Sequence, residues 1–211
     1  MSLEAFRVLE QPGMAAIARD LDMRVLWTND EFARQNGKTP AEMLGTTLHD
    51  ILPAPLAEER IRMMEPAIRG ERVVAYFQLW KGKRYLTRVW PLDPASFGVP
   101  GIFVVLAPWQ AEVENTPYED LPIVASPELA ELTVLSRREL EVLYQLALGM
   151  SAKDIASRFF RSVSTIERHI ESIHAKLGFS NRAEVVRFFV ERGLLAFSEA
   201  QWQRFIQEHQ G

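Results

Sequence analysis

The feature that most constrains this chain is the segment 162–177, which reads SVSTIERHIESIHAKL. Its apolar residues recur with spacings of four, three and four, so they share one stripe of a helix: Ile166, Ile170, Ile173 and Leu177. Ser162 can cap the first turn, and Gly178 can end the helix. The opposite face is small and polar. A helix with one buried stripe and one short polar face can enter the major groove of DNA.

The composition is that of an ordinary globular protein. The 211 residues suffice for one large domain or two small ones, and 47% of them are hydrophobic. No apolar run approaches the roughly 18 residues of a membrane span. The first residues lack the basic and long apolar regions of a signal peptide, so we expect a cytoplasmic protein with no membrane partner. The chain has no cysteine, which excludes disulfides, thiolate metal sites and cysteinyl-flavin photochemistry.

The charge is unevenly distributed, although the whole chain carries a net charge of −4. Residues 1–132 hold 13 Lys and Arg against 19 Asp and Glu, whereas residues 133–211 hold 11 against 9. The two parts therefore differ in sign. This asymmetry is compatible with an acidic sensory region joined to a module that binds nucleic acid.

The first half of the chain predicts an α+β domain in which the helices form a block between strands. The expected strands are 15–20, 25–28, 72–80, 83–90 and 102–108, and the expected helices are 31–35, 40–45 and 54–69. Lys81-Gly82 forms the tight turn of the second hairpin. The order of these elements predicts one antiparallel five-stranded sheet with inserted helices.

The stretch DLDMRVLWTNDEFARQNGKTPAEMLGTTLHDILP resembles a PAS sensory domain, in which a hairpin is followed by Asn, a short helix, Gly, Pro-x-Glu and Gly. The resemblance covers residues 14–108. It implies that Asn29 caps a helix and that Gly37 and Gly45 occupy turns. It further implies that this domain senses a signal or mediates dimerisation, without identifying a ligand.

The predicted sheet is rich in aromatic residues that could line a pocket for a planar ligand. The candidates are Trp27, Tyr76, Phe77, Trp80, Tyr85 and Trp90. The alternative is that these residues belong to the core or to a dimer face. A small molecule is the candidate ligand. Haem and flavin are not expected. His49 is the only histidine of this region and no pocket pattern supports it as a haem ligand, and a photoreactive flavin mechanism lacks its cysteine.

Three further segments surround the two principal domains. We expect an amphipathic helix at 1–13, an acidic, proline-containing linker at 109–132, and a C-terminal helix at 196–211. That last helix is amphipathic, so it needs a partner, either a second copy of the chain or the body of the protein. Dimerisation is predicted to involve Val185, Val186, Phe188, Phe189, Trp202 and Phe205.

The helical signals sharpen from residue 135 onward. Ser136 caps a helix that runs to Leu148, Ser151-x-x-Asp154 begins a short helix at 152–159, and Asn181 caps a helix at 182–192. A short helix, a turn and the helix at 162–177 make a helix-turn-helix. The sequence LSRRELEVLYQLALGMSAKDIASRFFRSVSTIERHIESIHAKLGFSNRAE resembles the LuxR/FixJ-type (GerE-like) four-helix DNA-binding domain over residues 133–195.

The polar face of the segment 162–177 predicts the base contacts, because Arg pairs with guanine O6 and N7 and Glu accepts from cytosine N4. The candidates are Ser164, Glu167, Arg168 and Glu171. Phosphate contacts are expected from Lys153, Thr165, Lys176 and Arg182, although Arg182 could instead pair with Glu139. The family commonly has basic residues where the two glutamates stand. This departure alters the sequence that is read or weakens the general affinity for DNA.

These patterns predict a one-component transcriptional regulator that binds double-stranded promoter DNA as a homodimer, with RNA polymerase as a candidate partner. The alternative is a PAS-based interaction module whose C-terminal domain contacts protein, since Glu167 and Glu171 make the key helix acidic. A related sigma-factor region is disfavoured by the ending KLGFSNR. No enzyme and no metal site are expected, because catalytic sets are absent and His169 and His174 lie on different flanks of their helix.

Overall fold

The computed structural model describes residues 13–109 and 121–209, and these residues divide into two compact units. The first unit contains residues 13–78, 85–109 and 121–126, and the second contains residues 79–84 and 127–209. Residues 1–12 of the helix expected at 1–13 lie outside the described residues. Within the described ranges, no helix is long and apolar enough to cross a membrane.

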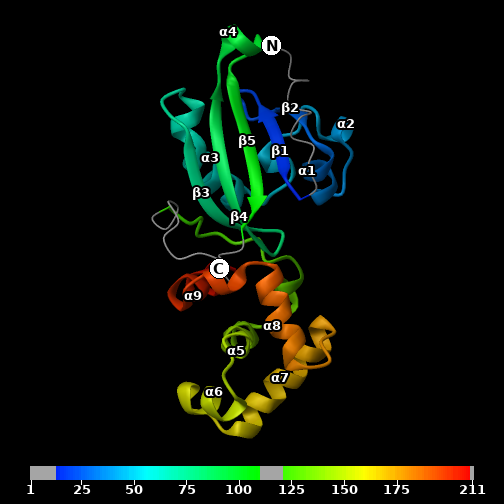
Figure 1. Cartoon of the computed structure of the whole chain (residues 1–211), viewed down its shortest axis with the longest axis vertical. Helices are drawn as coiled ribbons and strands as arrows, with labels where there is room; N and C mark the ends of the chain where they lie inside the picture. The colour runs from blue at the N-terminus through cyan, green and yellow to red at the C-terminus, as the bar shows by residue number, and fades with distance from the viewer. Residues whose placement is uncertain (1–12, 110–120, 210–211) are drawn as a thin grey trace. The chain divides into compact units, whose positions relative to one another are not determined.

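The first unit is a five-stranded antiparallel sheet with its helices inserted between the second and third strands (Figure 1). The strands are β1 (Ala15–Arg19), β2 (Val25–Thr28), β3 (Val74–Trp80), β4 (Lys83–Leu92) and β5 (Gly101–Pro108). The inserted helices are α1 (Asp30–Gln35), α2 (Pro40–Met43), η2 (Leu48–Asp50) and α3 (Ala54–Ile68), and α4 (Pro94–Phe97) joins β4 to β5. The strand order is β2-β1-β5-β4-β3. The predicted α+β fold is confirmed.

At one end of the paired strands β1 and β5, the two backbones lie so close that there is no room for a side chain on β5. A Cβ atom at Gly101 would lie 2.1 Å from the carbonyl oxygen of Arg19, so only glycine fits there. Asn29 fastens the other end of β1 to α1. Its Oδ1 accepts from the backbone N–H groups of Phe32 and Ala16, both at 3.0 Å. The predicted capping role of Asn29 is confirmed, and the same side chain also joins helix to sheet.

The two faces of the sheet carry different sets of side chains, because successive residues of a strand point to opposite faces. Tyr85 and Gln78 point toward the helices, since they bond Gln35 of α1 and Arg60 of α3. The opposite face carries a separate apolar cluster of Ala16, Ala18, Leu92, Phe103 and Val105, with Trp27 and Trp90 packed against it. The inserted helices therefore cover one face only.

The second unit is helical apart from residues 79–84, which are the end of β3, the turn after it and the start of β4. Its elements are η3 (Ala130–Val134), α5 (Arg137–Ala147), α6 (Ala152–Phe159), α7 (Val163–Leu177), α8 (Arg182–Glu191), η4 (Leu194–Ala196) and α9 (Glu199–His209). The N-caps of α5 to α8 are the four residues expected: Ser136, Ser151, Ser162 and Asn181. Helix α5 is central, since α6, α7, α8 and α9 all contact it.

The C-terminal helix α9 packs onto α5 within its own unit. Trp202 is fully buried, its ring stacks on Tyr144 with centroids 5.4 Å apart, and its Nε1 donates to the carbonyl of Leu140 at 3.1 Å. Phe205 meets the ring of Phe197 edge-on at 4.9 Å. Of the two predicted partners for this helix, the structure provides the body of the same chain.

We therefore predict that Trp202→Ala destabilises the helical unit by about 4 kcal/mol, because it removes a buried ring and leaves a cavity. Urea unfolding followed by far-ultraviolet circular dichroism measures the change. Gln207→Ala, on the exposed side of α9, is the matched control and should unfold as the wild type does. Equal midpoints for all three proteins would contradict the packing of α9.

Candidate functional site

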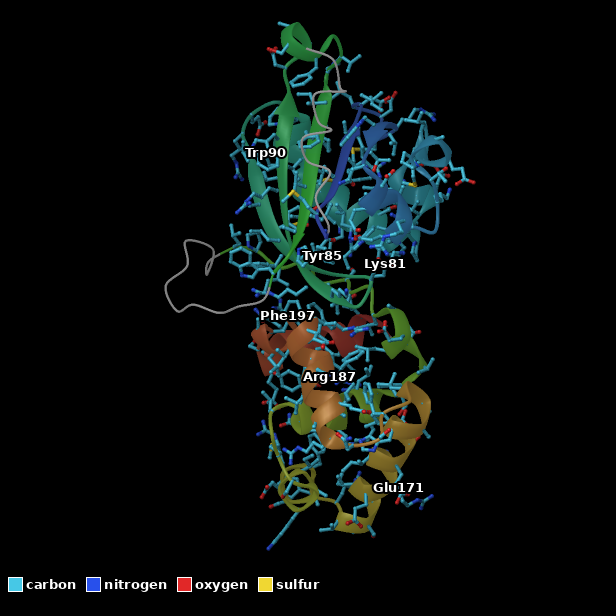
Figure 2. All side chains as sticks on the ribbon, turned by 45° about the vertical axis from the view of Figure 1, so that its right-hand side comes forward. Lys81, Tyr85, Trp90, Glu171, Arg187 and Phe197 are labelled. Carbon is cyan, nitrogen blue, oxygen red and sulfur yellow. The ribbon has the colours of Figure 1, made fainter. Side chains whose placement is uncertain are left out.

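Helix α7 is held by its apolar stripe and presents its polar face to solvent. Ile166 and Ile173 are completely buried, and α7 packs on α5 and α6. The four predicted base contacts lie on the exposed face: Ser164, Glu167, Arg168 and Glu171 (Glu171 is labelled in Figure 2). The structure therefore brings these four together on one accessible surface, as a groove-reading helix requires.

The first turn of α7 is secured by three hydroxyl groups. Ser162 Oγ accepts from the backbone N–H of Thr165 at 3.2 Å, and the same oxygen lies 2.8 Å from Thr165 Oγ1 and 3.0 Å from Ser164 Oγ. These contacts keep the start of the helix ordered where it faces solvent. Thr165, a predicted phosphate contact, thus has its hydroxyl shared with the helix cap.

The carboxylate of Glu139 fixes how α7 sits on α5. Its Oε1 accepts from Ser172 Oγ at 2.6 Å and from Lys176 Nζ at 2.9 Å, both on α7. Its Oε2 accepts from Lys176 Nζ at 2.7 Å and from the backbone N–H of Ser136 at 2.7 Å. Glu139 is only 4% exposed. One buried carboxylate therefore joins the cap of α5 to the second half of α7.

Burial by itself would raise the pKa of Glu139, but the hydrogen bonds from Lys176, Ser172 and Ser136 outweigh it and lower the pKa to about 2. A carboxylate whose pKa is lower in the folded state than in the unfolded chain stabilises the protein at pH values above its ordinary pKa of 4.5. That contribution is lost as the pH falls from 4.5 toward 2.

We predict that Glu139→Gln destabilises the helical unit at neutral pH by roughly 2 kcal/mol, because the amide cannot form the charged bonds. The variant should also lose less stability than the wild type between pH 5 and pH 3, a window within which Glu139 contributes. Urea titrations across this pH range measure the free energy of unfolding. Glu208→Gln, a change at an exposed glutamate, is the control. An unchanged pH profile in Glu139→Gln would contradict the assignment.

The predicted phosphate contacts differ in what they already bond. The ammonium of Lys176 pairs with Glu139 Oε2 at 2.7 Å and helps to hold α7 in place, although its side chain is 38% exposed, and its phosphate contact stays a prediction. The cation that pairs with Glu139 is Lys176, in the place that the alternative prediction gave to Arg182. Arg182 is exposed and lies near Asp154, whose pKa is lowered mainly by Ser151 and in part by Lys153 and Arg182. Lys153 and Arg182 therefore remain free to face a phosphate backbone.

Sequence reasoning missed two exposed residues in the turn between α6 and α7. Phe160 is 91% exposed, and Arg161 next to it is also exposed. The predicted helix ended at Phe159, so both residues were expected only as a turn. The signal that could have identified them is their position directly before α7, the helix that carries the predicted base contacts.

The six aromatic residues predicted to line a sensory pocket are not brought together. Tyr76 and Tyr85 lie on the helix-facing side of the sheet, whereas Trp27 and Trp90 lie on the other side (Tyr85 and Trp90 are labelled in Figure 2). Phe77 alternates with Tyr76, and Trp80 belongs to the second unit. Trp27 and Trp90 instead flank Phe103, at centroid distances of 6.3 and 6.2 Å. The alternation of side chains along strands separates the set.

The helix-facing side of the sheet contains a buried arginine with spare hydrogen-bonding capacity. Arg19 is 2% exposed, and its Nη1 donates to the carbonyl oxygens of Met23 at 2.6 Å and Thr46 at 3.3 Å. Its Nη2 has no hydrogen-bond partner among the described residues. Burial lowers the pKa of Arg19 to about 10, so it stays charged at neutral pH.

A chain of buried hydrogen bonds runs from the sheet to the segment 121–126. Gln78 Nε2 donates to Thr87 Oγ1 at 2.6 Å, and Arg60 Nε donates to Gln78 Oε1 at 2.9 Å. Arg60 also donates through Nη2 to the carbonyl of Ser126 at 3.3 Å. The residues Arg60, Gln78 and Thr87 are each at most 2% exposed. The interior of the first unit is thus bonded directly to the chain that leaves it.

The segment 121–126 is part of the first unit, which corrects that stretch of the linker predicted for 109–132; residues 110–120 of the predicted linker lie outside the described residues. The backbone N–H of Phe77, in the edge strand β3, donates to the carbonyl of Pro122 at 2.9 Å. The carbonyl of Phe77 accepts from the N–H of Val124, also at 2.9 Å. The carboxylate of Glu59 accepts from the backbone N–H groups of Ala125 at 2.7 Å and Ser126 at 2.9 Å. These partners are too distant in sequence for composition to reveal them.

We predict that Glu59→Gln releases this segment, because the amide can accept at only one of the two positions. Hydrogen exchange of the Ala125 and Ser126 amides should accelerate about tenfold, which corresponds to the loss of roughly one hydrogen bond. Glu58→Gln, at the neighbouring exposed position, is the matched control and should leave both rates unchanged. Equal exchange in the two variants would refute the anchoring role of Glu59.

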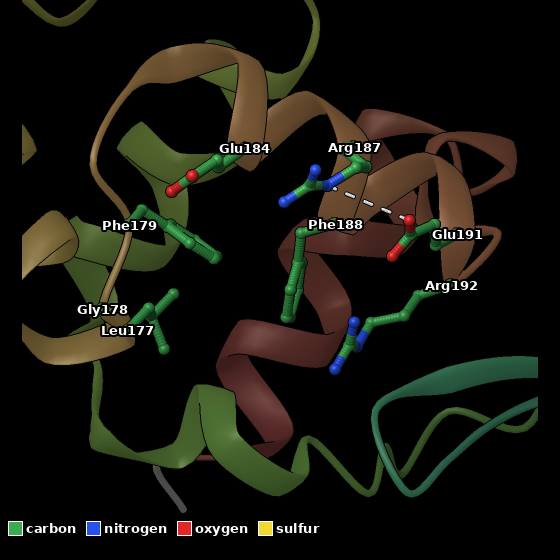
Figure 3. Close-up of a pocket in the computed structure, with 8 residues that line it drawn as sticks. All are labelled: Leu177, Gly178, Phe179, Glu184, Arg187, Phe188, Glu191 and Arg192. Carbon is green, nitrogen blue, oxygen red and sulfur yellow. Dashed lines mark ion pairs between the residues drawn. The ribbon is translucent and has the colours of Figure 1, made fainter.

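A hollow of about 280 Å³ lies on the second unit between the end of α7 and α8 (Figure 3). It is lined by Leu177, Gly178, Phe179, Glu184, Arg187, Phe188, Glu191 and Arg192. Phe179 and Phe188 meet edge-on at 5.4 Å, and the Arg192 guanidinium lies 3.8 Å from the Phe188 ring centroid. The hollow therefore combines apolar and charged walls, with Arg187 and Glu191 paired at 3.9 Å on its rim.

Most of the predicted dimer residues are buried within their own unit, which corrects their proposed role. Val185, Phe188, Phe189, Trp202 and Phe205 are at most 8% exposed, and Val186 is half-buried. Their apolar periodicity reflects the core of the helical unit. A second copy can reach α8 only through exposed residues such as Arg187, Val190 and Glu191, of which Val190 is 51% exposed.

Two protein-family models match this chain. The family described as "Bacterial regulatory proteins, luxR family" matches residues 133–189, and the family described as "PAS fold" matches residues 9–114. Over 64 residues the chain is 42% identical to the oxygen regulatory protein NreC of Staphylococcus aureus (strain JH9). That match covers 30% of this chain and 30% of NreC, so less than a third of the relative is represented.

Solved structures of VqmA are similar to the chain over most of its length. The Vibrio cholerae VqmA dimer in the absence of target DNA shares 18% identity at a TM-score of 0.46, covering 97% of this chain and 93% of that one. The VqmA–ligand–DNA complex shares 16% at 0.47, with 94% and 91% covered. The phage VqmA–DPO complex shares 20% at 0.47, with 95% and 93% covered.

Proposed function

Because this chain belongs to the PAS fold family and carries a DNA-binding domain of the LuxR family, we propose that it is a one-component transcriptional regulator. Its first unit senses a signal or mediates dimerisation, and its helix-turn-helix binds promoter DNA as a homodimer in the cytoplasm. RNA polymerase is a candidate partner at the promoter. The observation that carries the proposal is the exposed polar face of α7, presented by a helix whose other face is buried.

The side chains on that face suit a site that contains G·C pairs. Arg168 can donate two hydrogen bonds to guanine O6 and N7, and the carboxylates of Glu167 and Glu171 can each accept from a cytosine N4. Carboxylates also repel phosphates and the acceptor edges of other bases. The two glutamates therefore reduce affinity for unrelated sequences and increase the difference between the correct site and the rest.

Basic residues around α7 are suited to position the domain on the phosphate backbone. Lys153 on α6, Arg161 in the turn and Arg182 at the start of α8 are all exposed. Contacts of this kind set orientation and contribute affinity that depends on salt, without reading sequence. Arg168 alone then has to supply the positive charge on the reading face itself.

The proposed signal is a small molecule with a hydrogen-bond acceptor such as a carbonyl or carboxylate oxygen. The support for this class is Arg19, a buried cation on the helix-facing side of the sheet with a free N–H group. The bonds from Arg60 to Gln78 and Ser126 offer a route by which a change in the interior reaches the departing chain. A ligand that binds one arrangement of this network better than another shifts the population of that arrangement.

A second candidate function is a PAS-based module whose helical domain contacts protein instead of DNA. The acidic residues Glu167 and Glu171 on the exposed face of α7 favour it. The two functions differ in how binding responds to salt. Binding to duplex DNA weakens steeply as the salt concentration rises, because counterions are released from the phosphates.

We predict that Arg168→Ala lowers affinity for a duplex selected from genomic fragments by the wild-type protein about tenfold to a hundredfold, because a bidentate contact to guanine is lost. Affinity for unrelated duplexes should stay the same. Fluorescence anisotropy at several salt concentrations measures both.

Lys153→Ala is the comparison variant. It should weaken binding to all duplexes alike and reduce the dependence of binding on salt by about one phosphate contact. Unchanged affinity and unchanged sequence preference in Arg168→Ala would sink the assignment of α7 to the groove. Absence of salt-dependent DNA binding by the wild type would favour the protein-binding module.

A further inference from the structure

The turn of the helix-turn-helix exposes an aromatic ring to solvent. Phe160 is 91% exposed, the largest fraction for any large hydrophobic side chain among the described residues. It is the C-cap of α6 and lies two residues before Ser162, the N-cap of α7. The ring thus stands where the recognition helix begins.

Neither packing nor backbone geometry favours phenylalanine at this position. The backbone of Phe160 is left-handed, with φ 53° and ψ 50°, a conformation that suits glycine or asparagine at the end of a helix. Its ring gains no burial energy. The adjacent Phe159, by contrast, is half-buried with the Arg138 guanidinium 4.7 Å from its ring centroid. A bulky ring that is unfavourable on both counts indicates a binding role.

The residues around Phe160 connect it to the surface that faces DNA. Arg161 is exposed, and Val163, the first residue of α7, is 40% exposed. Ser164 and Glu167 continue the same exposed face along the helix. Phe160 therefore extends the proposed DNA surface at the end where recognition helices contact base edges.

We propose that Phe160 is a specificity-determining residue whose ring packs against the C5-methyl group of a thymine at the edge of the site read by α7; this rests on the proposed function. A phenylalanine ring has no hydrogen-bond donor or acceptor, so it distinguishes bases only by apolar contact. The thymine methyl is the apolar group of the major groove, and phenylalanine is among the side chains that contact it. Phe160 thereby adds a T·A preference beside the G·C preference of Arg168 and the glutamates.

The experiment first selects a tight-binding duplex from a random library with the full-length wild-type protein. Each thymine of that duplex is then replaced, one at a time, by deoxyuridine, which lacks only the C5-methyl group. At one position the wild type should lose about fourfold in affinity, as expected for one buried methyl group. Phe160→Asn should bind about tenfold more weakly and should not respond to the replacement at that position.

Stability separates a binding role from a structural one. Asparagine tolerates the left-handed backbone, so Phe160→Asn should unfold at the same temperature as the wild type or at a higher one. Phe160→Leu keeps an apolar group and should retain part of the response to deoxyuridine. Leu44→Gln removes an exposed apolar side chain from the first unit, outside the helix-turn-helix, and should leave DNA affinity unchanged.

Three outcomes would overturn the thymine contact. If the wild type selects a duplex but no thymine responds to replacement, or if Phe160→Asn responds as the wild type does, the contact does not exist and the proposed function still stands. If the wild type selects no duplex at all, the proposed function fails and the contact fails with it.

Discussion

The orientation of helix α7 depends on one buried carboxylate. Glu139 accepts four hydrogen bonds, three of them from Ser172 and Lys176 on α7 and one from the backbone of Ser136 at the cap of α5. An apolar stripe alone allows a helix to slide or rotate on its neighbour, because apolar contact is not directional. Directed bonds to a single carboxylate remove that freedom. Every base contact proposed for α7 requires the position that Glu139 sets.

The first unit uses charged side chains for a comparable purpose at its exit. Glu59 holds the amides of Ala125 and Ser126, and Arg60 next to it joins Ser126 to Gln78 within the buried layer. Two adjacent residues of α3 with opposite charges therefore bond the backbone at Ser126: Glu59 accepts from its N–H and Arg60 donates to its carbonyl. Under the proposed sensory function, this network is the part of the first unit that a ligand in the interior would act on.

The helices and the strand pattern could be predicted because their signals are local. Helix caps at Ser136, Ser151, Ser162 and Asn181 act on N–H groups three residues away, and the alternation of apolar residues announces the strands. The exposed set on α7 followed from periodicity in the same way. Periodicity could not say what covers an apolar stripe, so the rings of Phe189, Trp202 and Phe205 were assigned to a dimer when they belong to the core.

The sequence by itself thus determined the fold class, the helix-turn-helix and which residues of α7 face outward, since each follows from neighbours along the chain. Only the tertiary structure decided the partners: Lys176 with Glu139, Glu59 with the segment 121–126, and the separation of Tyr85 from Trp90 on opposite faces. These pairs join residues far apart in sequence. Hydrogen bonds and packing select them by distance in space, which composition and spacing do not encode.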